Sequence, residues 1–115
     1  MITGIHHVSI IVASEASIGF YAKLGFQEYR RIERGKDTVI LMSGYGIGLD
    51  LFLDSSHPAR SVEPLGPRYF SLKVDRIEST VAELGLAHGP IKQNWFGDRY
   101  CFVTDPDGNR VQLHE

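Results

Sequence analysis

The sequence contains an internal repeat, and this repeat constrains the fold more than any other feature. Asp50 lies 43 positions after His7 in the sequence, and Gln112 lies 43 positions after Tyr69. His7 begins the run HVSIIV, and Tyr69 begins the run YFSLKV. Each run is followed by a short helical pattern that ends in Leu-Gly-Phe or Leu-Gly-Leu. Because a missed repeat leads to a wrong fold assignment, we interpret the second half as a copy of the first. The copy would place four polar side chains at equivalent strand positions, which is one way to build a site.

Length and composition indicate one ordinary globular domain. The chain has 115 residues, of which 43% are hydrophobic and 23% charged, which is enough for a single core. The net charge of −2 argues against nucleic acid as a partner, because nucleic-acid-binding domains usually carry a clustered basic face. Arg30, Arg31 and Arg34 do cluster, but Glu28 and Glu33 alternate with them, so we interpret this run as a solvated strand face.

The cysteine content and the N-terminal sequence indicate in which cellular compartment the protein is expected. Cys101 is the only cysteine, so an intrachain disulfide is impossible and we expect a cytoplasmic protein. The first residues have neither a basic region nor a long apolar run, and therefore predict neither a signal peptide nor a membrane span.

Hydrophobic periodicity predicts the order strand, helix, strand, strand, strand in the first half. Residues 5–12 are apolar and β-branched, which favours a buried strand. Ser14 or Ser17 could cap a following helix, and Gly25 would end it. The three further strands are expected at 26–33, 38–42 and 47–53, with turns at 34–37 and 43–46.

The second half repeats this order. Asp75 and Glu78 form a capping-box pattern at the start of its helix, and Gly85 is a natural end. The sequence from Asp105 to Asn109 is a strong turn signal. The strands are expected at 68–74, 90–94, 98–104 and 110–114. Residues 54–67 contain three prolines and are predicted to be a linker between the halves or a flap over a site.

These elements predict an α+β fold of two βαβββ repeats, which form a curved, partly closed mixed sheet within a single domain 1–115. The repeats span about 1–54 and 68–115, with the linker at 55–67. If each helix covers one face of its half, the opposite faces enclose a cavity. Side-chain alternation along strands then adds further residues to the inner faces. The candidates for ligand contacts on these faces are Ser9, Phe52, Tyr69 and Ser71.

Three motifs, HHVSI at 6–10, FYAKLGF at 20–26 and DPDGNRVQL at 105–113, resemble those of the vicinal oxygen chelate superfamily. This group includes glyoxalase I, extradiol dioxygenases, fosfomycin-resistance and bleomycin-resistance proteins, and methylmalonyl-CoA epimerase. The resemblance covers essentially the whole chain and implies the glyoxalase/bleomycin-resistance/dioxygenase fold. It does not select an activity, because one fold hosts many functions.

The resemblance also implies where a metal would bind. In metal-dependent relatives, the ligands His, Glu, His and Glu, with a Gln in place of one His in some members, come from the first and last strand of each unit. By position these fall on His7, Asp50, Tyr69 and Gln112, so this chain differs at three of the four. An imidazole and a carboxylate suit Zn, Ni, Mn or Fe. Gln112 offers only a neutral carbonyl oxygen, and the phenol of Tyr69 keeps its proton at neutral pH.

We therefore expect either no cofactor or one weakly bound divalent metal, held by His7, Asp50 and Gln112. Asp50 is then the remaining candidate for a catalytic base. His114, His6 and Glu115 are further possible ligands, with His6 expected on the opposite strand face from His7. A hydrogen-bonded, partly buried histidine is the simpler alternative for His7.

Aromatic residues suggest a different site. Residues 93–99 resemble the corresponding stretch of metal-free bleomycin-resistance proteins. Trp95, Phe96 and Tyr69 could offer flat surfaces to a planar ligand, since aromatic stacking adds roughly 0.5–1.5 kcal/mol beyond area burial. The alternative is that Trp95 and Phe96 close the core at a strand end.

Two functional hypotheses remain. The favoured one is a homodimer that binds a small organic ligand in a concave pocket with a degenerate metal site. The alternative is a divalent-metal-dependent lyase, isomerase or dioxygenase of the glyoxalase I type. In many relatives each site combines ligand positions from two subunits, and the sequence does not distinguish a shared site from one within a single chain.

Overall fold

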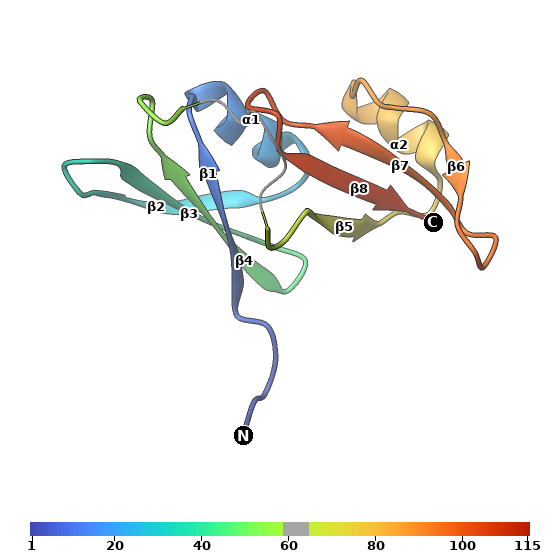
Figure 1. Cartoon of the computed structure of the whole chain (residues 1–115), viewed down its shortest axis with the longest axis horizontal. Helices are drawn as coiled ribbons and strands as arrows, with labels where there is room; N and C mark the ends of the chain where they lie inside the picture. The colour runs from blue at the N-terminus through green and yellow to red at the C-terminus, as the bar shows by residue number, and fades with distance from the viewer. Residues whose placement is uncertain (59–64) are drawn as a thin grey trace. The chain divides into compact units, whose positions relative to one another are not determined.

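The computed structural model describes residues 1–58 and 65–115. The chain divides into two compact units, Met1–Ala59 and Arg60–Glu115, and each unit contains one helix and four strands (Figure 1). In the described part of the chain, no helix has both the length and the apolar character needed to cross a membrane.

The first unit contains the first repeat. Its four strands form one mixed sheet in the order β1-β4-β3-β2. Strand β1 runs parallel to β4, and the other neighbours are antiparallel. The elements are β1 (His7–Val12), α1 (Glu15–Lys23), β2 (Gln27–Glu33), β3 (Thr38–Gly44) and β4 (Ile47–Leu53).

Alternation along the strands separates a buried face from an open face in this sheet. Ile40, Met42, Leu49 and Leu51 are completely buried, as is Tyr21 on α1. Burying side chains of this size contributes about 1.5–3 kcal/mol each, so this layer holds helix and sheet together. The residues between them in the sequence face the other way and form the open face of the first sheet.

The second unit repeats this plan in its own four-stranded sheet, with the order β5-β8-β7-β6 and with β5 parallel to β8. Its buried side chains include Ile77 and Val81 from the helix and Cys101, Val103 and Val111 from the strands. The elements are β5 (Tyr69–Lys73), α2 (Ile77–Leu84), β6 (Lys92–Gln93), β7 (Arg99–Thr104) and β8 (Arg110–His114).

The strand register confirms the repeat residue by residue. Ser9 pairs with Asp50 in the first sheet, and Ser71 pairs with Gln112 in the second. The predicted α+β class and the two βαβββ units are therefore confirmed. The hydrogen-bonded strands form two open sheets, one in each unit. Strand β6 has only two residues, where the sequence predicted a strand over 90–94.

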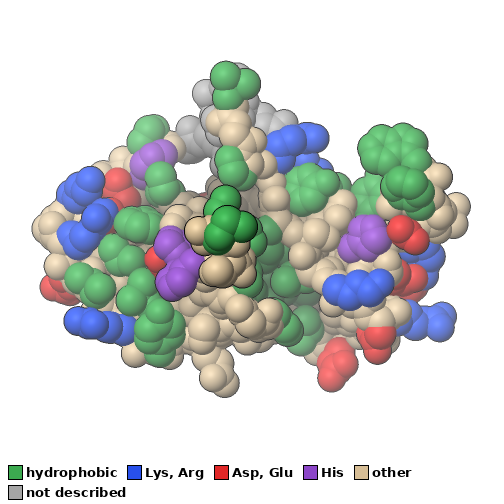
Figure 2. Space-filling model, turned by 90° about the horizontal axis from the view of Figure 1, so that it is seen from below, with side chains coloured by type: hydrophobic (Ala, Val, Ile, Leu, Met, Phe, Trp, Pro, Cys, Tyr) green, Lys and Arg blue, Asp and Glu red, His purple; other side chains and the backbone are tan. Residues whose placement is uncertain are grey.

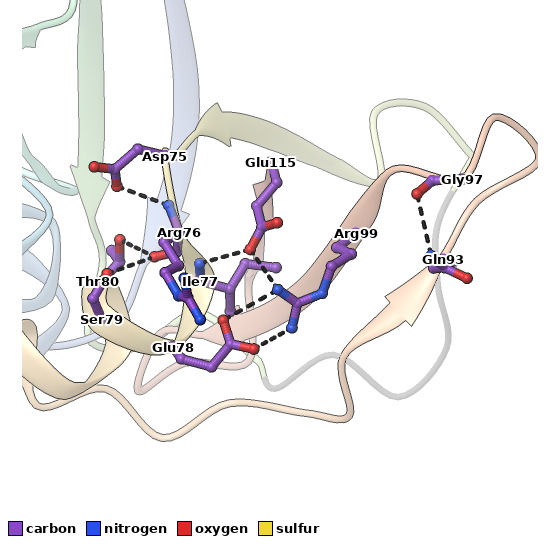
Figure 3. Close-up of polar contacts among 10 residues, drawn as sticks. All are labelled: Asp75, Arg76, Ile77, Glu78, Ser79, Thr80, Gln93, Gly97, Arg99 and Glu115. Atoms are coloured by element: carbon purple, nitrogen blue, oxygen red, sulfur yellow. Dashed lines mark hydrogen bonds and ion pairs between the residues drawn. The ribbon is translucent and has the colours of Figure 1, made fainter.

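The predicted capping box at Asp75 and Glu78 is wrong. Helix α2 begins at Ile77, and its N-cap residue is Arg76. The side chain of Arg76 makes no capping hydrogen bond. Instead, the Ile77 N–H donates a 2.9 Å hydrogen bond to Oε2 of Glu115, 38 residues away in the sequence. Glu78 points toward Arg99 and forms an ion pair with it (Figure 3). A long-range partner has therefore replaced the local cap.

Two other predictions concern the surface. The arginine run is a solvated strand face, as predicted: every residue of β2 is exposed, and Arg31 forms ion pairs with Glu15 and Glu28. The predicted linker has no helix or strand at 55–58 and 65–67. Its remaining residues, 59–64, lie outside the described part of the chain.

Candidate functional site

His7 and Asp50 lie side by side on the open face of the first sheet. Nε2 of His7 is 3.5 Å from Oδ2 of Asp50, and the two side chains are 42% and 18% exposed. Gly48, the register partner of His7, makes room for the imidazole. A Cβ atom on Gly48 would lie 3.0 Å from Cβ of His7, which is closer than side chains normally approach. The glycine thus lets the two polar groups meet at the sheet surface.

His6 does not lie on the opposite face from His7, contrary to the sequence expectation. It precedes β1, so strand alternation does not apply to it. Its Nδ1 is 2.9 Å from Nδ1 of His7, and the two rings meet edge to face. One nitrogen of His7 therefore contacts His6 while the other faces Asp50, which fixes the orientation of the imidazole.

A cavity of about 520 Å³ lies within the first unit, and neither His7 nor Asp50 lines it. Two of the predicted ligand-contact residues, Ser9 and Phe52, line it. This volume lies in the range of small-molecule pockets, about 300–1,000 Å³. Sequence reasoning did not select the other lining residues, several of which come from the turn between β2 and β3. These are Ile10, Ile11, Arg34, Lys36, Asp37, Asp54 and His57.

Arg34 forms one wall of the cavity. Its guanidinium carbon lies 5.1 Å from the ring centroid of Phe52, which is within the range of a cation–π contact. Nε and Nη2 of Arg34 each donate a 2.7 Å hydrogen bond to the Asp37 carboxylate. These hydrogen bonds lower the pKa of Asp37. At the rim of the cavity, the charge of Arg34 is thus neutralised by Asp37 through two hydrogen bonds, and the guanidinium lies over the Phe52 ring.

In the second unit, the matching positions are occupied by contacts within the sheet. Ser71 Oγ donates a 2.8 Å hydrogen bond to Oε1 of Gln112. Gln112 is only 9% exposed. Tyr69 packs edge to face against Phe102, with 4.9 Å between ring centroids. Neither side chain brings a negative charge to this face, so the two repeats differ chemically at equivalent positions.

Sequence reasoning missed Arg110, which lies on the same open face. Its guanidinium carbon is 3.8 Å from the ring centroid of Phe102, and its register partner on β5 is Tyr69. The available signal was its position two residues before Gln112 in β8, because residues two apart in a strand share a face.

Trp95 and Phe96 lie at the turn between β6 and β7 and are 95% and 84% exposed. The interpretation that they close the core is therefore wrong. Large hydrophobic side chains are also exposed elsewhere on the protein, and Figure 2 shows hydrophobic side chains at the surface. Asn94 holds the turn, since its Oδ1 accepts hydrogen bonds from the backbone N–H groups of Phe96 and Asp98. A role of Trp95 and Phe96 in ligand binding remains a prediction.

The additional metal ligands suggested by the sequence have other contacts. Nε2 of His114 lies 3.4 Å from Nδ2 of Asn94 and 3.9 Å from Oδ2 of Asp98. Oε2 of Glu115 accepts hydrogen bonds from the Ile77 backbone and from Arg99 (Figure 3). Glu115 is thus part of the contact that holds the start of α2.

The donor set does not fit the four-ligand metal centre that the resemblance implies. His7 and Asp50 are suitable as two ligands. The carbonyl oxygen of Gln112 already accepts a hydrogen bond from Ser71, and Tyr69 offers a phenolic O–H where the family has an imidazole. Within residues 1–58 and 65–115, no three His, Cys, Asp or Glu side chains gather as a metal-binding group.

Solved structures with similar folds include several enzymes and resistance proteins. A glyoxalase family protein from Enterococcus faecalis is 34% identical and has a TM-score of 0.87, with 97% of each chain covered. The trypanothione-dependent glyoxalase I of Leishmania major is 22% identical, with a TM-score of 0.75 over 98% of this chain and 86% of that one. A fosfomycin resistance protein from Listeria monocytogenes is 17% identical, with a TM-score of 0.73 over 99% and 93%. The last two show likeness of fold alone.

No match was found among curated proteins. A family model for the Glyoxalase/Bleomycin resistance protein/Dioxygenase superfamily matches residues 4–113. With nearly the whole chain matched, and with the two βαβββ units in place, the chain belongs to the Glyoxalase/Bleomycin resistance protein/Dioxygenase superfamily.

Proposed function

We propose that this protein binds a small organic ligand in the cavity of the first unit, without a four-ligand divalent metal centre. One observation carries the proposal: Gln112, at the position of a metal-binding carboxylate, has its side-chain oxygen engaged by Ser71 Oγ at 2.8 Å. A binding role needs a cavity of suitable size and a few polar groups. The 520 Å³ cavity beside Ser9 and Phe52 supplies these.

The cavity residues define how such a ligand is held. Phe52 and Ile11 provide apolar surface, and Ile11 is 50% exposed. The hydroxyl of Ser9 can donate or accept a hydrogen bond. His7 and Asp50 share the open face with Ser9, which lines the cavity, and offer an imidazole and a carboxylate on that face. These groups favour a ligand with an apolar body and one or two hydrogen-bonding groups.

The proposal is tested by measuring metal content and ligand binding on the same preparation. Metal per subunit is measured by plasma mass spectrometry, both as purified and after incubation with Zn, Ni, Mn or Fe(II) followed by desalting. A fragment library is then screened by ¹H–¹⁵N NMR. We expect background metal and fragments that shift the resonances of Ser9, Ile11 and Phe52. One tightly held equivalent of metal would overturn the proposal, and so would a screen without hits.

The contact between His7 and Asp50 supports a second candidate, a divalent-metal-dependent lyase, isomerase or dioxygenase. An imidazole nitrogen and a carboxylate oxygen 3.5 Å apart on a partly exposed face are two ligands of the type that Zn, Ni, Mn and Fe accept. In this candidate, Asp50 is also the available base. Assays with hemithioacetal and catechol substrates test it. Unchanged metal content and turnover in His7→Ala and Asp50→Ala would rule it out.

The proposed assembly is a homodimer. Strands β1 and β2 are the edges of the first sheet, and β5 and β6 are the edges of the second. Unpaired edges favour association with another chain, and a two-fold dimer is the commonest oligomer. Light scattering coupled to size-exclusion chromatography measures the mass directly. A mass of one chain, about 12.9 kDa, at micromolar concentration would contradict this proposal.

A further inference from the structure

The second sheet has an unusual distribution of charge. Its four strands, β5 to β8, contain no aspartate and no glutamate. Register and alternation place four basic side chains on its open face. The strands themselves contribute no carboxylate to this face, and the Asp98 carboxylate, in the turn before β7, lies 3.9 Å from His114 at one end of it. The two lysines and Arg110 leave an excess of positive charge, which attracts anions. The four side chains are Lys73, Lys92, Arg110 and His114.

Arg110 differs from the arginines that serve structural roles in this chain. Arg31, Arg34 and Arg99 each form an ion pair with a carboxylate. Arg110 instead lies over the ring of Phe102 at 3.8 Å, and no described carboxylate forms an ion pair with it. A guanidinium stacked on a ring keeps its N–H donors at its edges. Those donors match the two oxygens of a carboxylate or phosphate.

The strands on either side of Arg110 carry further hydrogen-bonding side chains at the register positions opposite it. Tyr69 and Thr104 are its register partners on β5 and β7, and each carries a hydroxyl. Gln112 lies two residues along β8 on the same face, and its Oε1 is engaged by Ser71. Among the described residues, no side chain or backbone oxygen accepts a hydrogen bond from its amide N–H groups. The amide N–H groups are therefore the part of this side chain that is left to donate to a ligand.

The same positions in the first unit have the opposite chemistry. There, His7, Gly48 and Asp50 occupy the places that correspond to Tyr69, Arg110 and Gln112. A carboxylate and an imidazole suit a cation. An arginine, an amide N–H and a phenol O–H suit an oxyanion. The two units therefore share the same backbone arrangement, but the side chains at these positions differ in charge.

We propose that the open face of the second sheet binds the oxyanion group of a small organic acid, carboxylate or phosphate, with Arg110 as the principal contact. Phe102 orients the guanidinium, and Gln112 and Tyr69 add neutral donors. This site goes beyond the proposed function, because every residue that carries it belongs to the second unit. It also gives a physical reason why a divalent cation is not favoured at these positions.

The test uses the full chain and three probes: inorganic phosphate, benzoate and the neutral isostere benzamide. Each is titrated while the Arg110 Nε–H and Gln112 side-chain resonances are followed by NMR. Phosphate, benzoate or both are expected to shift these resonances, whereas benzamide at the same concentration is not. Binding should weaken as salt rises, because exposed charges are screened. Benzoate alone would identify a carboxylate site, and phosphate alone would identify a phosphate site.

Two variants assign the binding to Arg110. Arg110→Gln should weaken the bound oxyanion about tenfold or more, the usual effect of losing a charge-assisted pair. Arg30→Gln, an exposed arginine on β2, is the matched control and should leave the affinity unchanged. Gln112→Glu retains Arg110 and its ring contact but adds a negative charge, so it should weaken binding even if Arg110→Gln does not fold. Circular dichroism establishes folding for each variant.

Three results would overturn the proposal. Benzamide that shifts the same resonances as strongly as benzoate would show apolar binding without a charge requirement. Equal affinities in Arg110→Gln and Arg30→Gln would place the site elsewhere. Absence of any shift with all three probes at millimolar concentration would show that this face is not an oxyanion site. None of these results bears on the cavity of the first unit, which the fragment screen tests separately.

Discussion

Ser71 Oγ donates a 2.8 Å hydrogen bond to Oε1 of Gln112 across the parallel strands β5 and β8. The equivalent strand pair in the first unit has Ser9 opposite Asp50, but there the carboxylate lies 3.5 Å from His7. The serine is thus common to both repeats, while its neighbour and the polar contacts have changed. This difference separates the imidazole–carboxylate contact of one unit from the neutral hydrogen bond of the other.

Ser71→Ala should lower the free energy of unfolding by about 1 kcal/mol, the typical cost of a lost hydrogen bond whose acceptor stays partly buried. Ser9→Ala removes the equivalent hydroxyl where no matching hydrogen bond to Asp50 is present, and should cost less than half as much. Urea denaturation monitored by circular dichroism measures both. Equal losses in the two variants would show that the serine contributes by packing and not through Gln112.

The two glycines that end the helices offer a second matched comparison. Gly25 has φ +108 and Gly85 has φ +64, both unfavourable for a side chain. A Cβ atom on Gly25 would also collide with the Tyr45 hydroxyl, whereas nothing lies within 4 Å of one on Gly85. The Tyr45 hydroxyl donates a hydrogen bond to the carbonyl of Leu24. This hydrogen bond holds the Tyr45 side chain next to Gly25.

We expect Gly85→Ala to cost about 1 kcal/mol from backbone strain alone. Gly25→Ala should cost about 2–3 kcal/mol, because strain adds to the displaced tyrosine. Denaturant titrations of both variants test the order. In the double variant Gly25→Ala with Tyr45→Phe, which lacks the hydroxyl, the cost of Gly25→Ala should fall toward that of Gly85→Ala. An unchanged cost would exclude the collision as its cause.

The ion pair between Glu78 and Arg99 should make the stability depend on pH in the acid range. The Arg99 guanidinium lowers the pKa of Glu78 from 4.5 to about 2. A carboxyl group whose pKa is lower in the folded state stabilises the protein above its unfolded pKa. That contribution is fully present above about 4.5, and is lost as the pH falls toward 2.

The comparison is between the natural chain and Glu78→Gln. The variant should be less stable at pH 6, and the difference should decrease steadily between pH 4.5 and pH 2. Glu83→Gln is the control, since Glu83 is exposed on the same helix and has no ion pair among the described residues. Thermal melts at half-unit pH intervals measure the trend. A difference that stays constant with pH would exclude the ion pair as its source.

Local periodicity was sufficient to predict most of the fold. The strands Ile47–Leu53 and Arg110–His114 begin and end at the residues that the sequence predicted, because alternation and turn residues act over a few positions. The start of α2 could not be predicted, because Glu115 makes the decisive contact from 38 residues away. A local capping pattern carries no information about such a partner.

In the candidate site, too, contacts between residues far apart in the sequence were harder to predict than local features. The repeat singled out His7 and Asp50, and the family resemblance paired them as ligand positions; the parallel pairing of β1 with β4 brings them together. The role of Arg110 depends on Phe102, a residue of the neighbouring strand that fixes the guanidinium by its ring. The exposure of Trp95 was equally undetermined, since an aromatic residue beside a turn can either join the core or protrude.

The cavity of the first unit leads to the last prediction. Ile11 lines the cavity and is half exposed, so Ile11→Trp should fill part of its volume without disturbing the buried face. Fragments that bind the natural chain should lose affinity at least tenfold, because their space is occupied, while the midpoint of thermal unfolding changes little. Ile5→Trp is the control, since Ile5 is 74% exposed and does not line the cavity. NMR titration of the same fragments against both variants gives the ratio of affinities. If fragments bind Ile11→Trp as tightly as Ile5→Trp, the ligand does not enter this cavity, and the proposed function must be assigned to another surface.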